Sequence, residues 1–443
     1  MPYPPGWLDF SLSRTIRFAD QPLPILLRGY EQFGPVFTVR VLHELIVFLI
    51  GPEANHYITV SNASNFLWRE SHFRDLAALI GDGLLTTDGE FHRRSRQIML
   101  PAFHRQQLEA AVDVMLSEVH HALQPLAKGA QLDMYAWLRR LALRIAMRAL
   151  FGLDPHSQDA RRLDAASLFE QALAFYATPY PMRMLRGPRT PWAKLVSAAR
   201  KLNHMIYREI AQRRASHQRG DDVLSLLLHA TDQDGAALSD SQVRDQVLTL
   251  LFAGHDTTTS TVSFMLYELC RNPNVTQRLL AEQDRVLKGQ TPTAQHLLGD
   301  AMPYLELVLD ETLRKYPPAW IGPRRSIDAF ELEGVSVPGD AHVNYSSWAS
   351  HHLPHVFPEP HRFIPERFTA QAKAALPKGA YVPFGGGSRT CIGMRFGQLE
   401  VRTLATEIVR HLSFELQPSF QLSIRQMPTI SPKRGLPLTV EAR

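Results

Sequence analysis

Hydrophobic and polar positions along the chain fall into three successive patterns. Residues 33–41 and 45–50 are rich in β-branched and aromatic residues and lie close together, so they predict a β-hairpin. From about residue 52 to 315 apolar residues recur mostly at helical spacing, with prolines and glycines as interruptions. From residue 316 to 365 prolines become frequent, and short strand-like pieces alternate with turns.

Two long helices are predicted in addition to this general pattern. Residues 240–270 predict one helix of about 45 Å, at 1.5 Å per residue. Residues 392–411 predict an amphipathic helix that directly follows a glycine-rich loop at 385–387. The loop and the residues around it therefore lie at a helix start, where backbone N–H groups are unpaired.

The fold class follows from the order of these segments. No repeat, low-complexity stretch or change of composition marks a linker, so we predict one large domain over residues 1–443. The domain should be mainly α with a smaller β-rich part. We expect the helix-rich part at about 52–315. The β-rich part should cover about 316–443 together with the hairpin at about 33–50.

Composition and charge exclude some classes of protein. The chain has 443 residues, is 45% hydrophobic and 21% charged, and carries a formal charge of +5, with its basic residues scattered. No Lys/Arg block indicates a nucleic-acid partner. No apolar run reaches the ~18–20 residues of a membrane span, and residues 1–7 do not resemble a signal peptide. The two distant cysteines, Cys270 and Cys391, form no disulfide framework, so we expect a cytoplasmic protein.

The strongest local signal is the sequence Phe384-Gly-Gly-Gly-Ser-Arg-Thr-Cys391-Ile-Gly393. A cysteine at a helix start meets unpaired N–H groups and the positive end of the helix dipole, which lower its pKa. The glycines let the backbone approach a flat ligand, and Arg389 can reach an anionic edge of that ligand. The alternatives are a structural cysteine, a phosphate loop, which would need Lys-Ser/Thr after the glycines, and a zinc site, which lacks further ligands at suitable spacing.

At these residues the chain resembles the cytochrome P450 family, whose motif is Phe-x-x-Gly-x-Arg-x-Cys-x-Gly. The fixed positions are matched by Phe384, Gly387, Arg389, Cys391 and Gly393. The resemblance implies the P450 fold and haem b as cofactor, with the Cys391 thiolate as the iron ligand. It further implies that Arg389 pairs with a haem propionate, and that Pro383, Phe384 and Gly393 lie beside the haem.

The middle of the predicted long helix reads Ala253-Gly254-His255-Asp256-Thr257-Thr258-Thr259, which is a poor helix sequence. The residues alone favour a helix break with Asp256 as a cap, over a bend that delivers protons. The resemblance reverses this preference, because the family carries Ala/Gly-Gly-x-Asp/Glu-Thr here. It implies that Thr257 hydrogen-bonds to bound dioxygen, that Asp256 relays protons, and that Ala253 lies over the haem. No role is assigned to His255.

A Glu-x-x-Arg pair at Glu311 and Arg314 places opposite charges on one helix face. That spacing alone is weak, because Glu282 and Arg285 share it and are expected on the surface. The resemblance implies that Glu311, Arg314 and Arg367 form a buried structural network that holds the haem-loop region.

Three further residues are candidates for binding the haem propionates. His92 and Arg96 lie four apart on one helix face, which suits a carboxylate partner, although a solvated basic helix is the alternative. Many family members carry Trp where this chain has His92. The resemblance implies Arg324 as a third anchor. Its neighbour Arg325 should point to the opposite side of the same strand.

Taken over nearly the whole chain, the resemblance implies a monooxygenase. One oxygen atom of O2 would enter an apolar organic substrate, with electrons from NAD(P)H through separate redox partners. The expected donor is a ferredoxin or flavodoxin-type protein with its reductase, and we hypothesise that Arg93 and Arg94 help to form its docking surface. Ala253 and the segment Ala319-Trp320-Ile321 are expected to line the substrate pocket.

Three other functions are weighed against this one. A peroxygenase would use hydrogen peroxide directly, but such members often lose the acid and the threonine that are present here at Asp256 and Thr257. A haem-binding gas sensor or carrier would not need that pair either. A helical protein without a cofactor conflicts with the cysteine motif. Fatty acid, terpenoid, steroid and polyketide substrates all remain open.

Overall fold

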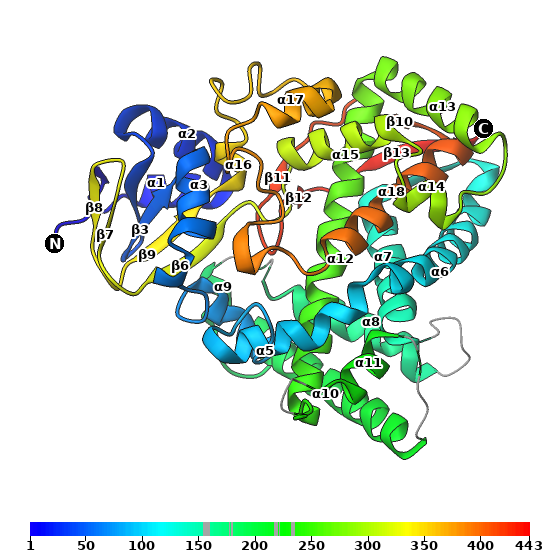
Figure 1. The fold of residues 1–443 in the computed structure, drawn as a ribbon, viewed down its shortest axis with the longest axis horizontal. Coiled ribbons are helices and arrows are strands. Elements are labelled where there is room, and N and C mark those ends of the chain that lie inside the picture. The colour runs from blue at the N-terminus through cyan, green and yellow to red at the C-terminus, as the bar shows by residue number, and fades with distance from the viewer. Residues whose placement is uncertain (154–159, 177, 179, 217–219, 221, 232–234) are drawn as a thin grey trace.

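A computed structural model describes residues 1–153, 160–176, 178, 180–216, 220, 222–231 and 235–443. Helices occupy the right of Figure 1, and most strands gather at the left with the N-terminus. The helices are α1 Leu12–Asp20, α2 Pro22–Phe33, α3 Pro52–His56, α4 Ala77–Ile80, α5 Gly89–Met99, α6 Arg105–Leu123, α7 Met134–Phe151, α8 Ala160–Leu173, α9 Tyr180–Arg183, α10 Pro191–Ser216, α11 Val223–His229, α12 Asp240–Arg271, α13 Pro273–Leu287, α14 Ala294–Leu298, α15 Pro303–Lys315, α16 Ser347–Ser350, α17 Ala370–Ala374 and α18 Met394–His411.

The strands form one large sheet and smaller ones. They are β1 Gly6–Trp7, β2 Val36–Val41, β3 Glu44–Leu49, β4 Phe66–Leu67, β5 Ala130–Asp133, β6 Gly322–Ser326, β7 Phe330–Leu332, β8 Val335–Val337, β9 His342–Tyr345, β10 Leu412–Leu416, β11 Ile424–Arg425, β12 Ser431–Pro432 and β13 Pro437–Ala442. In the described residues the largest sheet has the order β1-β2-β3-β9-β6-β4. The others pair β10-β13-β5, β11-β12 and β7-β8.

The predicted hairpin is β2 and β3, which pair antiparallel from Val36 opposite Leu49 to Val41 opposite Glu44. Leu42, in the turn, has a φ of 53°. On its other edge β3 pairs parallel with β9, so the start of β9 lies beside the start of β3 with Ile46 opposite His342. The hairpin is thus joined in one sheet to strands from the β-rich region almost 300 residues later.

Helix α12 runs through the middle of the molecule as one continuous helix, as predicted, and no break occurs at residues 253–259 (Figure 1). A capping box between Ser239 and Gln242 begins it. The hydroxyls of Thr257, Thr259 and Thr261 bond back to carbonyls one turn earlier; Thr257 donates to the Ala253 carbonyl at 2.6 Å. This back-bonding satisfies the hydroxyls within the helix groove, so the poor helix sequence does not end the helix.

The main hydrophobic core lies among α6, α7, α10, α12, α15 and α18, and smaller clusters lie on the two faces of the large sheet. Helix α18 begins at Met394, two residues after the predicted start at Ile392, because Gly393 occupies the N-cap position. No helix in the described part of the chain is both long and apolar enough to cross a membrane.

Candidate active site

A cavity of about 2050 Å³ lies where α5, α12, β6 and the start of α18 converge. Ligand pockets are commonly about 300–1,000 Å³, so this one has room for a prosthetic group and a substrate together. Most of the predicted site residues line it: His92, Arg96, Ala253, Thr257, Ala319, Trp320, Ile321, Arg324, Pro383, Phe384, Arg389 and Cys391. Asp256 and Gly393 do not, and the Glu311 network lies elsewhere.

Cys391 presents its thiol to this cavity from the loop before α18. Its backbone N–H donates to the Phe384 carbonyl at 3.0 Å, which closes the loop. Burial raises the pKa of the Cys391 thiol, although the backbone N–H of Gly393 and the charge of Arg96 lower it. The expected lowering of this pKa is therefore wrong for the protein groups alone, because desolvation outweighs the helix start.

The glycine-rich loop packs partly against protein. Gly387 has a φ of +60°, and a Cβ there would lie 2.2 Å from the Thr59 carbonyl oxygen. Gly385 and Gly386 line the cavity, whereas Gly387 does not. The expectation that all the glycines approach a flat ligand thus needs correction. A side chain at position 387 would be strained at this φ and would clash with the segment Tyr57–Ser61, so glycine is needed there for packing within the protein.

Positively charged and donor side chains gather on one side of the cavity. Burial, followed by the charges of Arg389 and Arg96, lowers the pKa of His92 to about 3. Arg389 pairs with Asp88 at 2.6 Å and donates to the Thr87 carbonyl at 2.9 Å. No salt bridge joins Arg96 to a carboxylate among the described residues. This wall is therefore an anion-binding surface.

The two adjacent arginines of β6 point to opposite sides of the strand, as expected. Arg324 is 3% exposed, lines the cavity and lies with its guanidinium 3.7 Å from the ring centre of Trp68. Arg325 turns away and pairs with Asp340 at 2.7 Å. Burial lowers the pKa of Arg324 to about 10, so it is a desolvated cation at neutral pH. Arg324, not Arg325, thus faces any ligand in the cavity.

Helix α12 presents Ala253 and Thr257 to the cavity, whereas Asp256 does not line it. Asp256 is 1% exposed, and its Oδ1 lies 3.0 Å from Nη1 of Arg139 on α7. His255 is fully buried, with Nδ1 3.6 Å from Asp256 Oδ1 and Nε2 3.1 Å from Glu170 Oε1. Burial alone would raise the pKa of Glu170. Hydrogen bonds and charge from His255 and Arg139 nevertheless lower this pKa to about 2.

Arg139 and Glu170 were missed by sequence reasoning, as was the role of His255. They come from α7 and α8, far from α12 in the sequence, and only packing brings them to Asp256. The charge pattern along each of these helices gives no signal for the cluster. Glu170 is 36% exposed, so the cluster extends from the buried Asp256 toward solvent.

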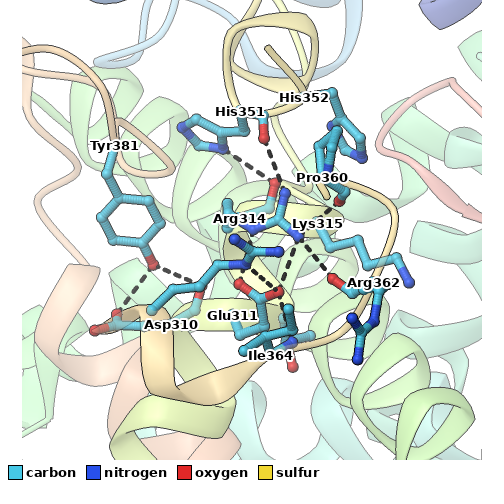
Figure 2. A network of polar contacts seen from close by, with 12 residues as sticks. Asp310, Glu311, Arg314, Lys315, His351, His352, Pro360, Arg362, Ile364 and Tyr381 are labelled. Carbon is cyan, nitrogen blue, oxygen red and sulfur yellow. Dashed lines mark hydrogen bonds and ion pairs between the residues drawn. The ribbon is translucent and has the colours of Figure 1, made fainter. Parts of the chain in front are cut away.

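The predicted ion network has the expected contacts (Figure 2). Glu311 accepts two hydrogen bonds from Arg314, Nε at 2.7 Å and Nη2 at 2.9 Å. Arg314 also donates to the carbonyls of His351, Pro360 and Arg362 at 2.9, 2.8 and 3.3 Å. Both partners are fully buried, and every charged group in the pair has several hydrogen-bond partners.

This network is connected to the chain just before the cysteine loop. Arg367 lies with Nε 3.4 Å from Glu311 Oε1, and the Ile364 N–H donates to the same oxygen at 2.9 Å. The Val382 N–H donates to Nε2 of His351 at 3.0 Å. Because Val382 is close in sequence to the glycine-rich loop, the network fixes the approach of that loop to the cavity.

One expectation about a charged surface residue is wrong. Glu282 is 6% exposed, and its carboxylate accepts hydrogen bonds from the N–H groups of Tyr304 and Leu305 at 2.7 and 2.9 Å. It thereby caps the start of α15, a contact between helices that spacing cannot reveal. Arg94 donates to the Ala236 carbonyl at 3.1 Å, and its place in a docking surface stays a prediction.

Arg93 remains exposed, with an ion pair to Glu90 one turn earlier. Cys270 fits its expected role as a core residue near a helix end. Its Sγ lies 3.8 Å from the Phe414 carbonyl, and burial raises its pKa to about 12.

The profile of the cytochrome P450 family matches residues 2–436. The chain belongs to the cytochrome P450 family. The fold class and the family predicted from the cysteine motif are confirmed, as are haem b as cofactor and a monooxygenase activity that uses O2, an organic substrate and redox partners. The cavity fits this cofactor, because its wall combines a thiol, Cys391, with the cations Arg96 and Arg324, which have no carboxylate partner among the described residues.

Known P450s that resemble the chain differ in what their names record. "Putative cytochrome P450 120" from Synechocystis is 31% identical, covering 98% of this chain and 96% of its own length. "Cyclooctat-9-en-7-ol 5-monooxygenase" from Streptomyces melanosporofaciens is 34% identical over 71% of this chain and 69% of its own length. The structure titled "Retinoic acid bound cyanobacterial CYP120A1" superimposes with a TM-score of 0.88, at 30% identity and full coverage of both chains.

Proposed function

We propose that this P450 monooxygenase inserts one oxygen atom into an apolar substrate of the isoprenoid class. The observation that carries the proposal is the cavity of about 2050 Å³, which extends from the thiol of Cys391 along apolar side chains. These include Phe73, Leu76, Phe175, Trp192, Leu250 and Phe252. An isoprenoid is favoured over other apolar compounds because one relative is named for a cyclic terpenoid alcohol and another structure for bound retinoic acid.

Binding spectra of the haem-loaded protein test the substrate class. Retinoic acid and a monocyclic or bicyclic terpene alcohol should displace the sixth iron ligand and shift the Soret band at low micromolar concentration. Palmitic acid serves as the apolar control that is not an isoprenoid, and it should bind more weakly. Tighter binding of palmitic acid than of any isoprenoid would contradict the proposed class, while the monooxygenase activity would stand.

The residues around the cavity have distinct proposed roles. Bound haem would supply the activation of dioxygen. Cys391 would hold the iron through its thiolate, and His92, Arg96, Arg324 and Arg389 would hold the propionates. Pro383, Phe384 and Gly393 would lie beside the haem, next to the cysteine. Ala253 and the segment 319–321 would bound the substrate on the opposite side.

Proton delivery is proposed to run along α12. The Thr257 hydroxyl lines the cavity and donates its single proton to the Ala253 carbonyl at 2.6 Å, so it would have to turn away from that carbonyl to donate toward a ligand there. Asp256 does not line the cavity but contacts Arg139, and Glu170 is the exposed end of that cluster. Protons would pass from solvent through this cluster to Asp256 and then to Thr257.

Two substitutions test this route. Thr257→Ala should raise peroxide release per electron consumed and lower product yield, with haem content unchanged. Asp256→Asn should lower turnover by about 10²–10⁴-fold, the usual worth of a positioned proton donor. Thr261→Ala, one turn further on and also in the cavity wall, is the control and should leave coupling intact. Unchanged coupling in the Thr257 variant would contradict its role.

The electron donor is proposed to be a ferredoxin or flavodoxin-type protein with its NAD(P)H-dependent reductase, acting in the cytoplasm. Arg395 supports a basic docking surface, because it is exposed on the first turn of α18, four residues after Cys391. Arg395→Glu and Arg93→Glu should slow reduction by an acidic ferredoxin, more strongly at low salt. Product formation with hydrogen peroxide alone at an equal rate would favour a peroxygenase.

A further inference from the structure

A second group of possible metal ligands lies where two strands of the large sheet begin, apart from the cysteine loop. Glu44 begins β3 and His342 begins β9, two central strands of the sheet, and His72 begins a short 3₁₀ turn, His72–Leu76. One carboxylate oxygen and one ring nitrogen from each histidine all lie within 4.8 Å of one another. The parallel pairing of β3 with β9 places the two strand starts side by side, so the sheet itself holds two of the three groups.

The contacts within this Glu44–His72–His342 cluster leave ligand capacity unused. His72 Nε2 lies 2.8 Å from Glu44 Oε2, and the rings of His72 and His342 stack with centres 4.7 Å apart. Nδ1 of His342 is buried and has no hydrogen-bond partner among the described residues. His43 Nε2 lies 3.8 Å from the other Glu44 oxygen and is largely exposed, so it can supply a fourth ligand.

The charges around the cluster favour a cation. Glu44 has ion-pair contacts with histidines and none with Lys or Arg in the described part of the chain. The nearby guanidinium of Arg325 is neutralised by Asp340 at 2.7 Å.

A second cluster of the same composition contains a carboxylate whose charge is already balanced by an arginine. His120, Glu407 and His411 also bring three such groups within 4.8 Å. There, however, Arg410 lies 3.0 Å from Glu407, so a permanent cation already balances the carboxylate. The Glu44 cluster has no such cation, and this difference selects it as the stronger candidate.

We propose that Glu44, His72 and His342 bind a divalent transition-metal ion of the zinc class. Two imidazoles and one carboxylate suit Zn²⁺ and disfavour Mg²⁺, which prefers oxygen ligands. Because Glu44 and His72 also line the mouth of the large cavity, the ion would tie the segment His72–Leu76 to the sheet. Metal binding would thereby stiffen one wall of the substrate cavity. The proposal is independent of the substrate class.

The test measures metal content and thermal stability on the haem-loaded protein. The protein is stripped with EDTA, dialysed against Zn²⁺ or Mg²⁺, and analysed for zinc, magnesium and iron. The wild type should retain one Zn²⁺ per chain beside its haem iron, no Mg²⁺, and a higher Tm with Zn²⁺. His342→Ala and the milder Glu44→Gln should weaken Zn²⁺ binding by about 100-fold or more, since even outer partners of a ligand are worth about 10–100-fold.

His411→Ala in the second cluster is the matched control and should keep both the Zn²⁺ and the rise in Tm. The carbon monoxide difference spectrum of each variant reports intact folding around the haem. The proposal would be overturned if the wild type retains no Zn²⁺, or if His411→Ala loses the ion while Glu44→Gln and His72→Gln keep it.

Discussion

Two regions of this P450 contain buried arginines, and they differ in whether a carboxylate balances the positive charge. In the Glu311 network, Arg314 is fully buried, pairs with Glu311 through two hydrogen bonds and donates to three carbonyls (Figure 2). In the cavity, Arg324 is 3% exposed, yet it donates to one carbonyl, that of Pro323, and lies over the Trp68 ring. Arg314 thus has a carboxylate partner, whereas Arg324 has none within salt-bridge distance among the described residues, because the nearby Asp88 pairs with Arg389.

The difference indicates what each region is for. A buried charge is costly unless it is paired and hydrogen-bonded, so the Glu311 network is complete as a structural unit. The cavity keeps Arg96 and Arg324 without a carboxylate partner among the described residues, so an anionic ligand there would be favoured. We propose that haem propionates supply the missing anions. One network thus stabilises the fold, and the other favours the bound cofactor.

Loss of Arg314 should have the largest effect. Arg314→Ala leaves Glu311 buried with only Arg367 nearby and should lower the free energy of unfolding by about 3–5 kcal/mol. Denaturant unfolding followed by circular dichroism measures this, with the exposed Arg278→Ala as control. A loss below about 1 kcal/mol would show that the network does not stabilise the fold.

Loss of Arg324 should act on the cofactor and not on the fold. Arg324→Met removes an unneutralised charge, so the haem-free protein should be at least as stable as the wild type. Haem dissociation should be faster by about 10- to 100-fold, because a charge-assisted hydrogen bond contributes ~1.5–3 kcal/mol. Transfer of haem to an acceptor protein measures the rate. If the variant instead destabilises the haem-free protein and leaves haem release unchanged, Arg324 stabilises the fold and does not bind the cofactor.

A third buried ionisable group, the carboxyl group of Glu400 on α18, should make the stability of the protein depend on pH. Burial raises the pKa of Glu400 to about 8, although Thr258 donates a hydrogen bond to it. The folded state therefore holds a proton that the unfolded state releases near its ordinary pKa. Stability should fall as the pH rises from about 5 to 8, by up to about 1.4 kcal/mol per unit. Glu400→Gln should remove this slope in urea titrations at each pH.

The smallest effect is expected at Arg325, the neighbour of Arg324 on β6. Its guanidinium points out of the cavity to the exposed Asp340, so Arg325→Ala should change haem release by less than about twofold. Equal haem loss in the Arg325 and Arg324 variants would mean that haem retention does not depend on which side of β6 the arginine faces.

Local patterns were sufficient for much of this protein. The hairpin, the long α12 and the helix after the cysteine loop follow from periodicity, because each pattern is set within one segment. The cysteine motif led to the family, since it holds its fixed residues at short spacing. The separation of Arg324 from Arg325 followed from the alternation of side chains along a strand.

Other features depend on how far charge is buried and on which segments meet. The pKa of Cys391 rises because its environment is desolvated, which no local pattern reports. Glu282 and Arg285 match the spacing of Glu311 and Arg314, yet Glu282 caps another helix.

The sequence by itself determined the hairpin, the two long helices and the family, and it predicts Cys391 as the thiolate ligand, because these depend on residues that are neighbours in the chain. The tertiary structure alone decided the cluster of Asp256 with Arg139 and Glu170, and the meeting of Glu44, His72 and His342 where β3 and β9 begin. Each of these groups joins separate segments, and the interaction energy of charged groups depends on distance and burial. Both quantities exist only once the chain has folded.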